Sequence, residues 1–281
     1  MPRLEVLLTV TTYPLPSKNY TELVCTAGML RDGTWIRIYP IPLSFLNGLK
    51  RDGVLQPTKY SWIELDLEPV RNSKDFRPES YTPRHKDFRD LVVGEHIKTV
   101  RNWRFRKDWC LKDVWTNMTD LIEASKDPNF KSLVTFKPAK IHRLEVEETD
   151  EDWNSVYAEL DKQLDIFSMD KEGGAKIRKR VKKVPYKFCY RFEDETGRIS
   201  RMMIEDWEVG MLYWKALERA NGNREIAVKK VVQRYQDIFL AKNDIYLFLG
   251  TTKKFHAKNA PNPFTIIGVF YPLKESQGSL F

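Results

Sequence analysis

The sequence predicts an α+β fold in which a mixed or antiparallel β-sheet, or a partial barrel, is built from N- and C-terminal strands. Apolar stretches rich in β-branched residues lie near both ends of the chain, whereas helical patterns and a basic linker lie between them. Because no β-α-β unit repeats, the order of these patterns favours α+β over a doubly wound sheet. The 281 residues are 42% hydrophobic, which is enough apolar material for a large core.

The first part of the chain is predicted to be mostly β. Residues 4–15 and 21–30 are rich in Leu, Val and Thr, and turn-forming residues bound both stretches. The Asp-Gly pair in Arg31–Thr34 predicts a tight hairpin leading into the strand 35–42. Residues 60–70 alternate between apolar and polar side chains, as a half-buried strand does.

The centre of the chain is predicted to be mixed. Prolines interrupt the first part of residues 71–117, and the stretch is predicted to be helical from about Gly94. A short helix follows at 118–127, with Thr119 as its N-cap. Residues 132–148 are predicted to form one or two strands, and residues 150–164 a helix with an acidic first turn.

The last third is predicted to contain a hairpin at 184–204, two helices and two closing strands. The helices, 205–222 and 224–241, are separated by Asn221-Gly222, a typical helix stop. Strands at 244–250 and 263–272 flank a loop. These patterns divide the chain into an α+β region at 1–164, a flexible basic linker at 165–184, a second α+β region at 185–274 packed on the first, and a tail at 275–281.

Composition narrows the classes of partner. A net charge of +8 favours polyanions such as DNA or RNA. No apolar stretch is long enough to cross a bilayer and no signal peptide is recognisable, so we expect a cytoplasmic protein without membrane contact. The three cysteines lack metal-ligand spacing, and no phosphate-binding loop is present. We therefore expect no metal site and no cofactor, apart from Mg²⁺ if the protein is a nuclease.

Two short motifs share the pattern Gln-x-x-aliphatic-Phe. They are QLDIF, with Gln163, Leu164, Ile166 and Phe167, and QGSLF, with Gln277, Leu280 and Phe281. Both resemble the peptides by which proteins dock on the DNA sliding clamp, where the aliphatic and aromatic side chains enter an apolar pocket. The alternative is that QLDIF is the last turn of an amphipathic helix and that QGSLF is a tail packed on its own domain.

Basic residues cluster in several places, often beside aromatic side chains. Cations neutralise phosphates, and aromatic rings stack on unpaired bases. The predicted nucleic-acid contacts are Arg77, Arg84, Arg101, Arg104, Arg106, Lys179, Arg180, Lys253, Lys254 and His256. The alternative is a solvated helix face, a basic linker and a lysine-rich turn, and Trp103 and Trp109 are expected in the core.

Carboxylates suggest a second, enzymatic interpretation. Glu205, Asp206 and Glu208 lie close together in the sequence, and Glu79 and His85 lie on a proline-rich loop. Paired carboxylates can hold Mg²⁺ for phosphodiester cleavage, so Glu79, His85, Asp206 and Glu208 are the candidate catalytic residues. The structural alternative is that Asp206 and Glu208 cap and charge the start of a helix.

Several stretches, among them TYPLPSKNYTELVCTAG, WIRIYPIP, FRPESY and IEDWEVGMLYWKAL, resemble a prokaryotic family described only as hypothetical proteins. The resemblance covers most of the chain and implies one integrated protein, without an activity. By analogy of fold, a compact barrel of the PUA or ASCH kind, which binds RNA or modified bases, suits the terminal strands. The leading hypothesis is a nucleic-acid-binding accessory protein recruited to the sliding clamp, and the alternative is a metal-dependent nuclease.

Overall fold

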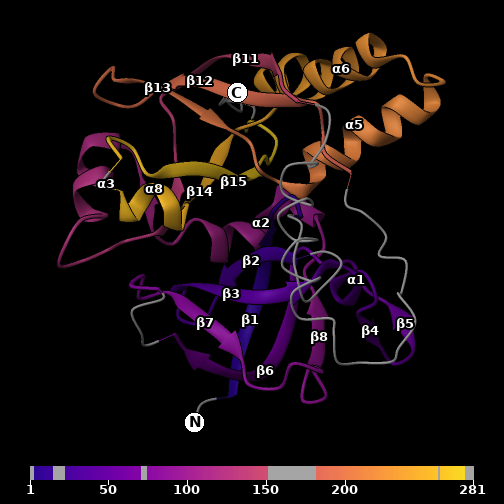
Figure 1. The fold of residues 1–281 in the computed structure, drawn as a ribbon, viewed down its shortest axis with the longest axis vertical. Helices are drawn as coiled ribbons and strands as arrows, with labels where there is room; N and C mark the ends of the chain where they lie inside the picture. Colours follow the sequence, from indigo (N-terminus) through magenta and orange to yellow (C-terminus); the bar gives the residue numbers. More distant parts are fainter. Residues whose placement is uncertain (1–2, 15–22, 71–74, 151–181, 259, 276–281) are drawn as a thin grey trace, which may run out of the picture.

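The computed structural model describes residues 3–14, 23–70, 75–150, 182–258 and 260–275. They form two halves stacked along the long axis of the molecule, with the N-terminal half below and the C-terminal half above (Figure 1). The predicted α+β class is confirmed. In chain order the elements are β1 (Arg3–Thr11), β2 (Leu23–Met29), β3 (Trp35–Pro42), α1 (Leu43–Leu46), β4 (Lys50–Arg51), β5 (Val54–Leu55), β6 (Ser61–Pro69), β7 (Ser80–Pro83), β8 (Val92–His96), α2 (Val100–Cys110), β9 (Val114–Trp115), α3 (Met118–Ala124), β10 (Leu133–Phe136), β11 (Lys140–Glu148), β12 (Tyr186–Glu193), β13 (Ile199–Met203), α5 (Trp207–Arg219), α6 (Arg224–Val232), the π-helix η1 (Gln233–Ile238), α7 (Phe239–Lys242), β14 (Tyr246–Thr251), α8 (Lys253–Ala257) and β15 (Phe264–Phe270).

The N-terminal half is a closed five-stranded mixed barrel. Its strands follow the order β1-β2-β3-β7-β6, and β6 pairs back onto β1; only β3 and β7 run parallel. The barrel interior is filled by aliphatic side chains such as Val6, Ile36 and Leu65, all fully buried. At the predicted Asp-Gly turn, Gly33 has a φ of 92°, which glycine adopts without strain, and Asp32 Oδ1 accepts a hydrogen bond from Thr34 N at 2.8 Å.

The C-terminal half combines two sheets. One has the order β15-β14-β10-β9, and the other has the order β11-β12-β13. An isolated bridge between Ile204 and Ile266 joins them. A core rich in aromatic side chains, including Tyr190, Phe192 and Tyr213, fills the space between these sheets and α5, α6 and η1. The predicted hairpin, the two helices and the closing strands are all present here.

A third apolar cluster joins the halves. Leu7 on the outer face of the barrel packs with Phe248 and Ile267 of the C-terminal half. Trp103 and Trp109, expected in the core, are partly buried and pack against this cluster. Fully burying one large apolar side chain contributes about 1.5–3 kcal/mol, so a contact of this kind holds the halves in one fixed arrangement.

Three local expectations were wrong. The chain is not helical from Gly94, because Val92–His96 pairs with β6 as β8, and the regular part of α2 follows Arg101–Trp103, whose φ angles of 50°, 49° and 63° are left-handed. Asn117, not Thr119, caps α3, since its side chain accepts bonds from two backbone N–H groups. The loop after β14 contains α8, which the Thr252 hydroxyl caps.

The predicted boundary near residue 164 and most of the predicted linker lie outside the described residues. β11, which precedes them, pairs along its length with β12, which follows them. Within the described residues, no helix combines the length and the apolar character that crossing a membrane requires.

Tyr13, just after β1, makes a second connection between the halves. Its ring packs against Gly210 of α5 so closely that a Cβ atom at Gly210 would overlap it. Its hydroxyl accepts a hydrogen bond from Trp214 Nε1 and donates one to Lys182 O, both at 2.7 Å. The start of α5 is therefore fitted to the end of β1.

We expect Gly210→Ala to lower the free energy of unfolding by about 1–3 kcal/mol, the usual cost of overpacking. The direction is informative because alanine normally stabilises a helix by about 1 kcal/mol relative to glycine. Urea unfolding measures the change, and Lys215→Ala at an exposed position of α5 serves as the control. A Gly210→Ala protein as stable as the wild type would contradict this close packing.

Candidate functional site

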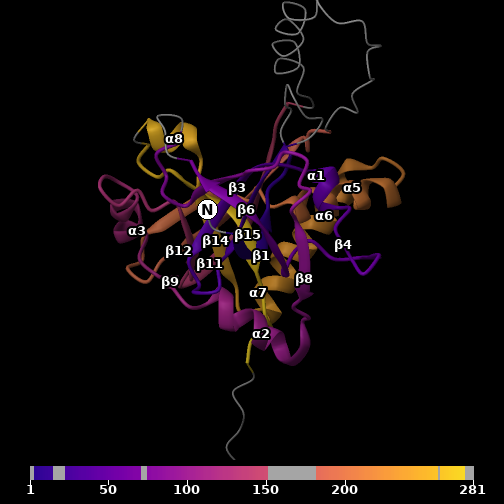
Figure 2. The same cartoon turned by 90° about the horizontal axis from the view of Figure 1, so that it is seen from below.

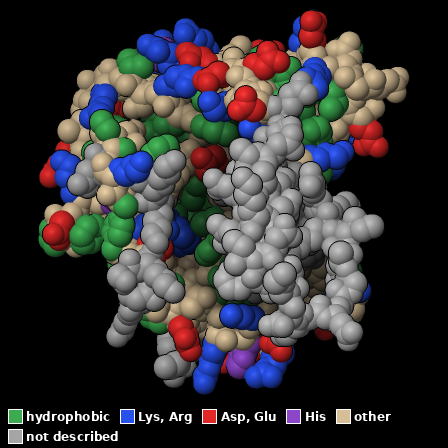
Figure 3. All heavy atoms as spheres, in the orientation of Figure 1, with side chains coloured by type: hydrophobic (Ala, Val, Ile, Leu, Met, Phe, Trp, Pro, Cys, Tyr) green, Lys and Arg blue, Asp and Glu red, His purple; other side chains and the backbone are tan. Residues whose placement is uncertain are grey.

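A cavity of about 1070 Å³ lies between the outer face of the barrel and the C-terminal half. Figure 3 shows a hollow between the halves, with hydrophobic, acidic and basic side chains on its visible walls. Small-molecule sites usually measure about 300–1000 Å³ and favour interfaces of this kind. Its walls include Arg37, Tyr39, Arg77, Tyr81, Glu205 and Thr265.

The floor of the cavity consists of neighbouring strand segments of the C-terminal half. Leu133 pairs with Gly250 and Gly250 pairs with Thr265, while Glu205 N donates to Ile266 O at 2.7 Å. The absence of a side chain at Gly250 lets the side chain of Ile267 pack directly against β14, because a Cβ atom at Gly250 would collide with it. The two ends of this row therefore lie close to β10 and to the start of α5.

Arg37 of β3 places a buried positive charge in the wall. The residue is 3% exposed, and its terminal nitrogens donate to Ser80 Oγ at 3.2 Å and to Ser132 Oγ and O at 3.0 and 3.4 Å. Within the described residues, its guanidinium forms no ion pair and its Nε–H has no hydrogen-bond acceptor. Burial lowers the pKa of Arg37 and the nearby Arg77 lowers it further, whereas Cys25 and the carboxylates of Glu79 and Asp75 raise it. Arginine nevertheless remains cationic, since the guanidinium group is the most basic of the protein side chains.

Arg77 differs from Arg37 because its charge is compensated. Its Nε and Nη2 bind both oxygens of Asp75 at 2.8 Å, and its Nη1 donates to Thr251 O at 2.8 Å. Burial would raise the pKa of Asp75, but these bonds outweigh it and hold that pKa at about 2. Arg77, predicted as a nucleic-acid contact, thus lines the cavity with its guanidinium largely occupied.

Glu205 is the acidic counterpart of Arg37. Glu205 lines the cavity, and burial raises its pKa. The nearby Thr265 hydroxyl opposes this rise in pKa. The proton of that hydroxyl is donated to Met203 O at 2.9 Å. No ion pair to Glu205 occurs among the residues that the structure describes. A half-buried carboxyl without a cationic partner is available to a ligand that carries N–H or O–H donors.

The candidate catalytic residues Asp206 and Glu208 hold the start of α5. Asp206 is fully buried, caps α5 through Glu208 N at 3.0 Å, and contacts Lys59 Nζ at 2.8 Å. Glu208 contacts the same Nζ at 3.0 Å. Burial alone would lower the pKa of Lys59, but its attraction to these carboxylates outweighs burial and raises it. Both carboxylates therefore serve Lys59 and the helix start, as the structural alternative states.

Glu79 also binds within the protein. Its carboxylate accepts hydrogen bonds from Ser132 N at 3.0 Å and Ser132 Oγ at 2.8 Å. It therefore fixes the serine that Arg37 contacts. The predicted contact Arg84 lies on the surface beside Glu68, at 3.9 Å.

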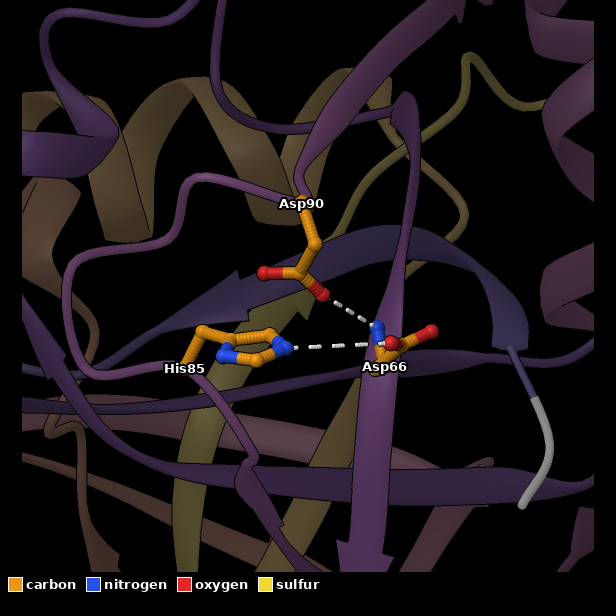
Figure 4. Close-up of side chains that lie close together, drawn as sticks. All are labelled: Asp66, His85 and Asp90. Atoms are coloured by element: carbon orange, nitrogen blue, oxygen red, sulfur yellow. Dashed lines mark hydrogen bonds and ion pairs between the residues drawn. The ribbon is translucent and has the colours of Figure 1, made fainter.

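The fourth catalytic candidate, His85, lies beside Asp66 and Asp90 (Figure 4). One atom from each of these residues falls within 4.8 Å of the others, a spacing compatible with a metal ion. Arg89 Nη2 contacts His85 Nδ1 at 3.2 Å, so a neutral ring carries its proton on Nε2, which faces Asp66 at 4.0 Å. Asp90 Oδ2 accepts from Asp66 N at 2.7 Å. Asp66 and Asp90 are thus joined by one hydrogen bond and His85 by another to Arg89, and a metal ion on Nε2 would have to replace its proton.

The predicted basic contacts do not form one patch. Arg101 and Arg104 are exposed on α2, which lies on the opposite side of the molecule from α8 in Figure 2. Arg106 is 6% exposed, 3.9 Å above the ring of Tyr60. His256 is also 6% exposed, between Thr251 and the Ser125 carbonyl. Lys253 and Lys254 begin α8, directly after the cavity residue Thr252.

The remaining predicted residues, Lys179, Arg180 and both glutamine motifs, lie outside the described part of the chain. Arg37 is not among the residues predicted from the sequence. The sequence feature that could have identified it is its place between Ile36 and Ile38 in a predicted strand. Because side chains alternate along a strand, Arg37 lies on the face opposite the barrel interior.

Family comparisons cover nearly the whole chain. Residues 2–112 match DUF8758, a domain of unknown function, and residues 114–281 match DUF8757, also a domain of unknown function. The chain belongs to the DUF8757 family. The boundary between the two matches falls between α2 and β9, where the chain leaves the barrel. Among curated proteins, none matches the sequence.

We expect Lys59→Met to lower the free energy of unfolding by about 3–5 kcal/mol, because it leaves the buried charge of Asp206 without its partner. Adding Asp206→Asn should recover part of this loss, since asparagine caps a helix without a charge. Urea unfolding measures both. Lys126→Met, which breaks an exposed ion pair with Glu123, is the control and should cost at most about 1 kcal/mol. Equal effects of Lys59→Met and Lys126→Met would contradict a buried pair.

Proposed function

We propose that the protein binds nucleic acid and takes one unpaired nucleotide into the cavity, with a phosphate against Arg37. The observation that carries this proposal is the buried guanidinium of Arg37, which lines the cavity without an ion pair in the described residues. A buried cation is stabilised by an anion, and arginine binds phosphate through its planar set of N–H donors.

The other walls suit a nucleotide. Tyr39, which is 49% exposed, lies at the cavity together with Tyr81 and Tyr186. Stacking a base on an aromatic side chain contributes about 1–3 kcal/mol and tolerates any base. The cavity volume of about 1070 Å³ leaves room for a base, a sugar and a phosphate.

The net charge of the whole chain, +8, favours the same partner. Lys183 and Lys187 line the cavity, together with Asp75, Asp150 and Glu205, and Lys187 is paired with Glu147 at 2.7 Å. Cations near a binding site attract the phosphate backbone, and they make affinity fall as salt rises. A metal-dependent nuclease, the alternative from the sequence, has less support, because Glu79, Asp206 and Glu208 bind protein partners.

We expect Arg37→Met to weaken binding of fluorescent single-stranded oligonucleotides about tenfold or more, the value of a hydrogen bond to a charged group. Fluorescence anisotropy at two salt concentrations measures it, with DNA, RNA, duplex and free mononucleotides as separate arms. Tighter binding of mononucleotides than of oligonucleotides would replace nucleic acid with a free nucleotide as the ligand.

Arg219→Met, at an exposed arginine in the last turn of α5, is the matched control and should leave the affinity within about twofold, apart from its small share of the general charge. Because Arg37 also contacts Ser132, urea unfolding of Arg37→Met and of the charge-preserving Arg37→Lys must accompany the assay. Wild-type affinity in a folded Arg37→Met protein would contradict the proposal.

We also propose recruitment to the DNA sliding clamp, which rests on the sequence of QLDIF and QGSLF alone. Calorimetry with the host's clamp tests it. We expect binding by the full chain and a loss when the chain ends before Gln277 or when Leu164 and Phe167 are changed to Ala, because both changes remove the apolar anchors. Failure of the intact protein to bind would reject recruitment.

A further inference from the structure

Glu205 and Arg37 mark opposite ends of the cavity floor. Arg37 binds Ser132, next to Leu133 of β10, and Glu205 hydrogen-bonds to Ile266 of β15. The strand segments between them are β14 and β15, so three interstrand spacings of about 4.8 Å separate the two ends, roughly 14 Å in all. Side chains reaching inward shorten that span to about the length of one nucleotide.

The chemistry at the two ends differs in sign. The cationic end offers N–H donors, whereas the Glu205 end offers two carboxylate oxygens, which only accept hydrogen bonds when ionised. A ligand that fills the cavity must therefore carry an anion at one end and N–H donors at the other. Nucleotides have this polarity, with a phosphate at one end and a base edge at the other.

Building on the proposed nucleotide site, we propose that Glu205 determines its base specificity and selects guanine. The N1–H and N2–H groups of guanine point in parallel and match the two oxygens of one carboxylate. Adenine and cytosine place a ring nitrogen acceptor beside their amino group, and thymine and uracil flank their single N–H with carbonyl oxygens. Each of these bases would bring an acceptor against the Glu205 carboxylate, and an unpaired buried acceptor is costly.

The test uses the wild-type protein first and needs no variant. The probes are fluorescent single strands of thymidine (DNA) or of uridine (RNA). Each strand carries one central guanine, hypoxanthine, adenine or cytosine. Hypoxanthine differs from guanine only in lacking the N2 amino group. We expect guanine to bind about tenfold or more tightly than hypoxanthine, since one hydrogen bond to a charged acceptor is lost.

Glu205→Gln then tests the residue. Glutamine keeps the size but presents one acceptor and one donor, so the preference for guanine over hypoxanthine should fall to about twofold or less. Glu218→Gln, an exposed carboxylate at the far end of α5, should keep the full preference. Arg37→Met should weaken every oligonucleotide alike and leave their ranking unchanged.

The outcomes separate this inference from the proposed function. Oligonucleotide binding without a preference for guanine would overturn the role of Glu205 and leave the proposed function standing. A preference that persists in Glu205→Gln would overturn it as well. If no oligonucleotide binds, both proposals fail together.

Discussion

The buried contact between Lys59 and Asp206 determines how the two halves meet. Asp206 caps α5, its backbone bridges to Thr12 after β1, and its carboxylate faces the ammonium group of a barrel residue. A buried ion pair contributes little net stability, because desolvation offsets the attraction, but breaking it is costly. Its main effect is geometric: it fixes where α5 begins, and with it the fit of Gly210 against Tyr13 and the position of Glu205.

The charged side chains near this junction are of two kinds, those with an ion-pair partner and those without one among the described residues. Lys59 faces Asp206 and Glu208, and Arg77 holds Asp75, so these groups stabilise the join. Arg37 and Glu205 form no ion pair within the described residues, although burial disfavours the charged form of each. A fold does not gain stability from leaving a buried or half-buried charge without a partner. Such departures from local rules are expected at binding sites, where a ligand supplies the missing partners.

The sequence predicted those parts of the fold that depend on near neighbours. Alternation along β6, the Asp-Gly turn and the cap at Asp206 are local patterns, and each gave the right element. β8 was missed because its strand character comes from pairing with β6, about 30 residues earlier along the chain. The site was missed for the same reason. Ser132 reaches Arg37 and Thr265 reaches Glu205 only through tertiary packing, which no single stretch of sequence encodes.

Under the proposed function, the burial of Arg37 determines which form of nucleic acid would fit the cavity. A base in a duplex is stacked and paired, so it reaches a buried group only by leaving the helix, at a cost of a few kcal/mol. An unpaired base avoids that cost and keeps the stacking that the tyrosines offer. Because charges interact more strongly in a low-dielectric site than in water, a phosphate beside Arg37 contributes more there than beside an exposed arginine such as Arg104. Binding at the cavity would therefore favour single strands, whereas binding through exposed cations alone would favour the higher charge density of a duplex.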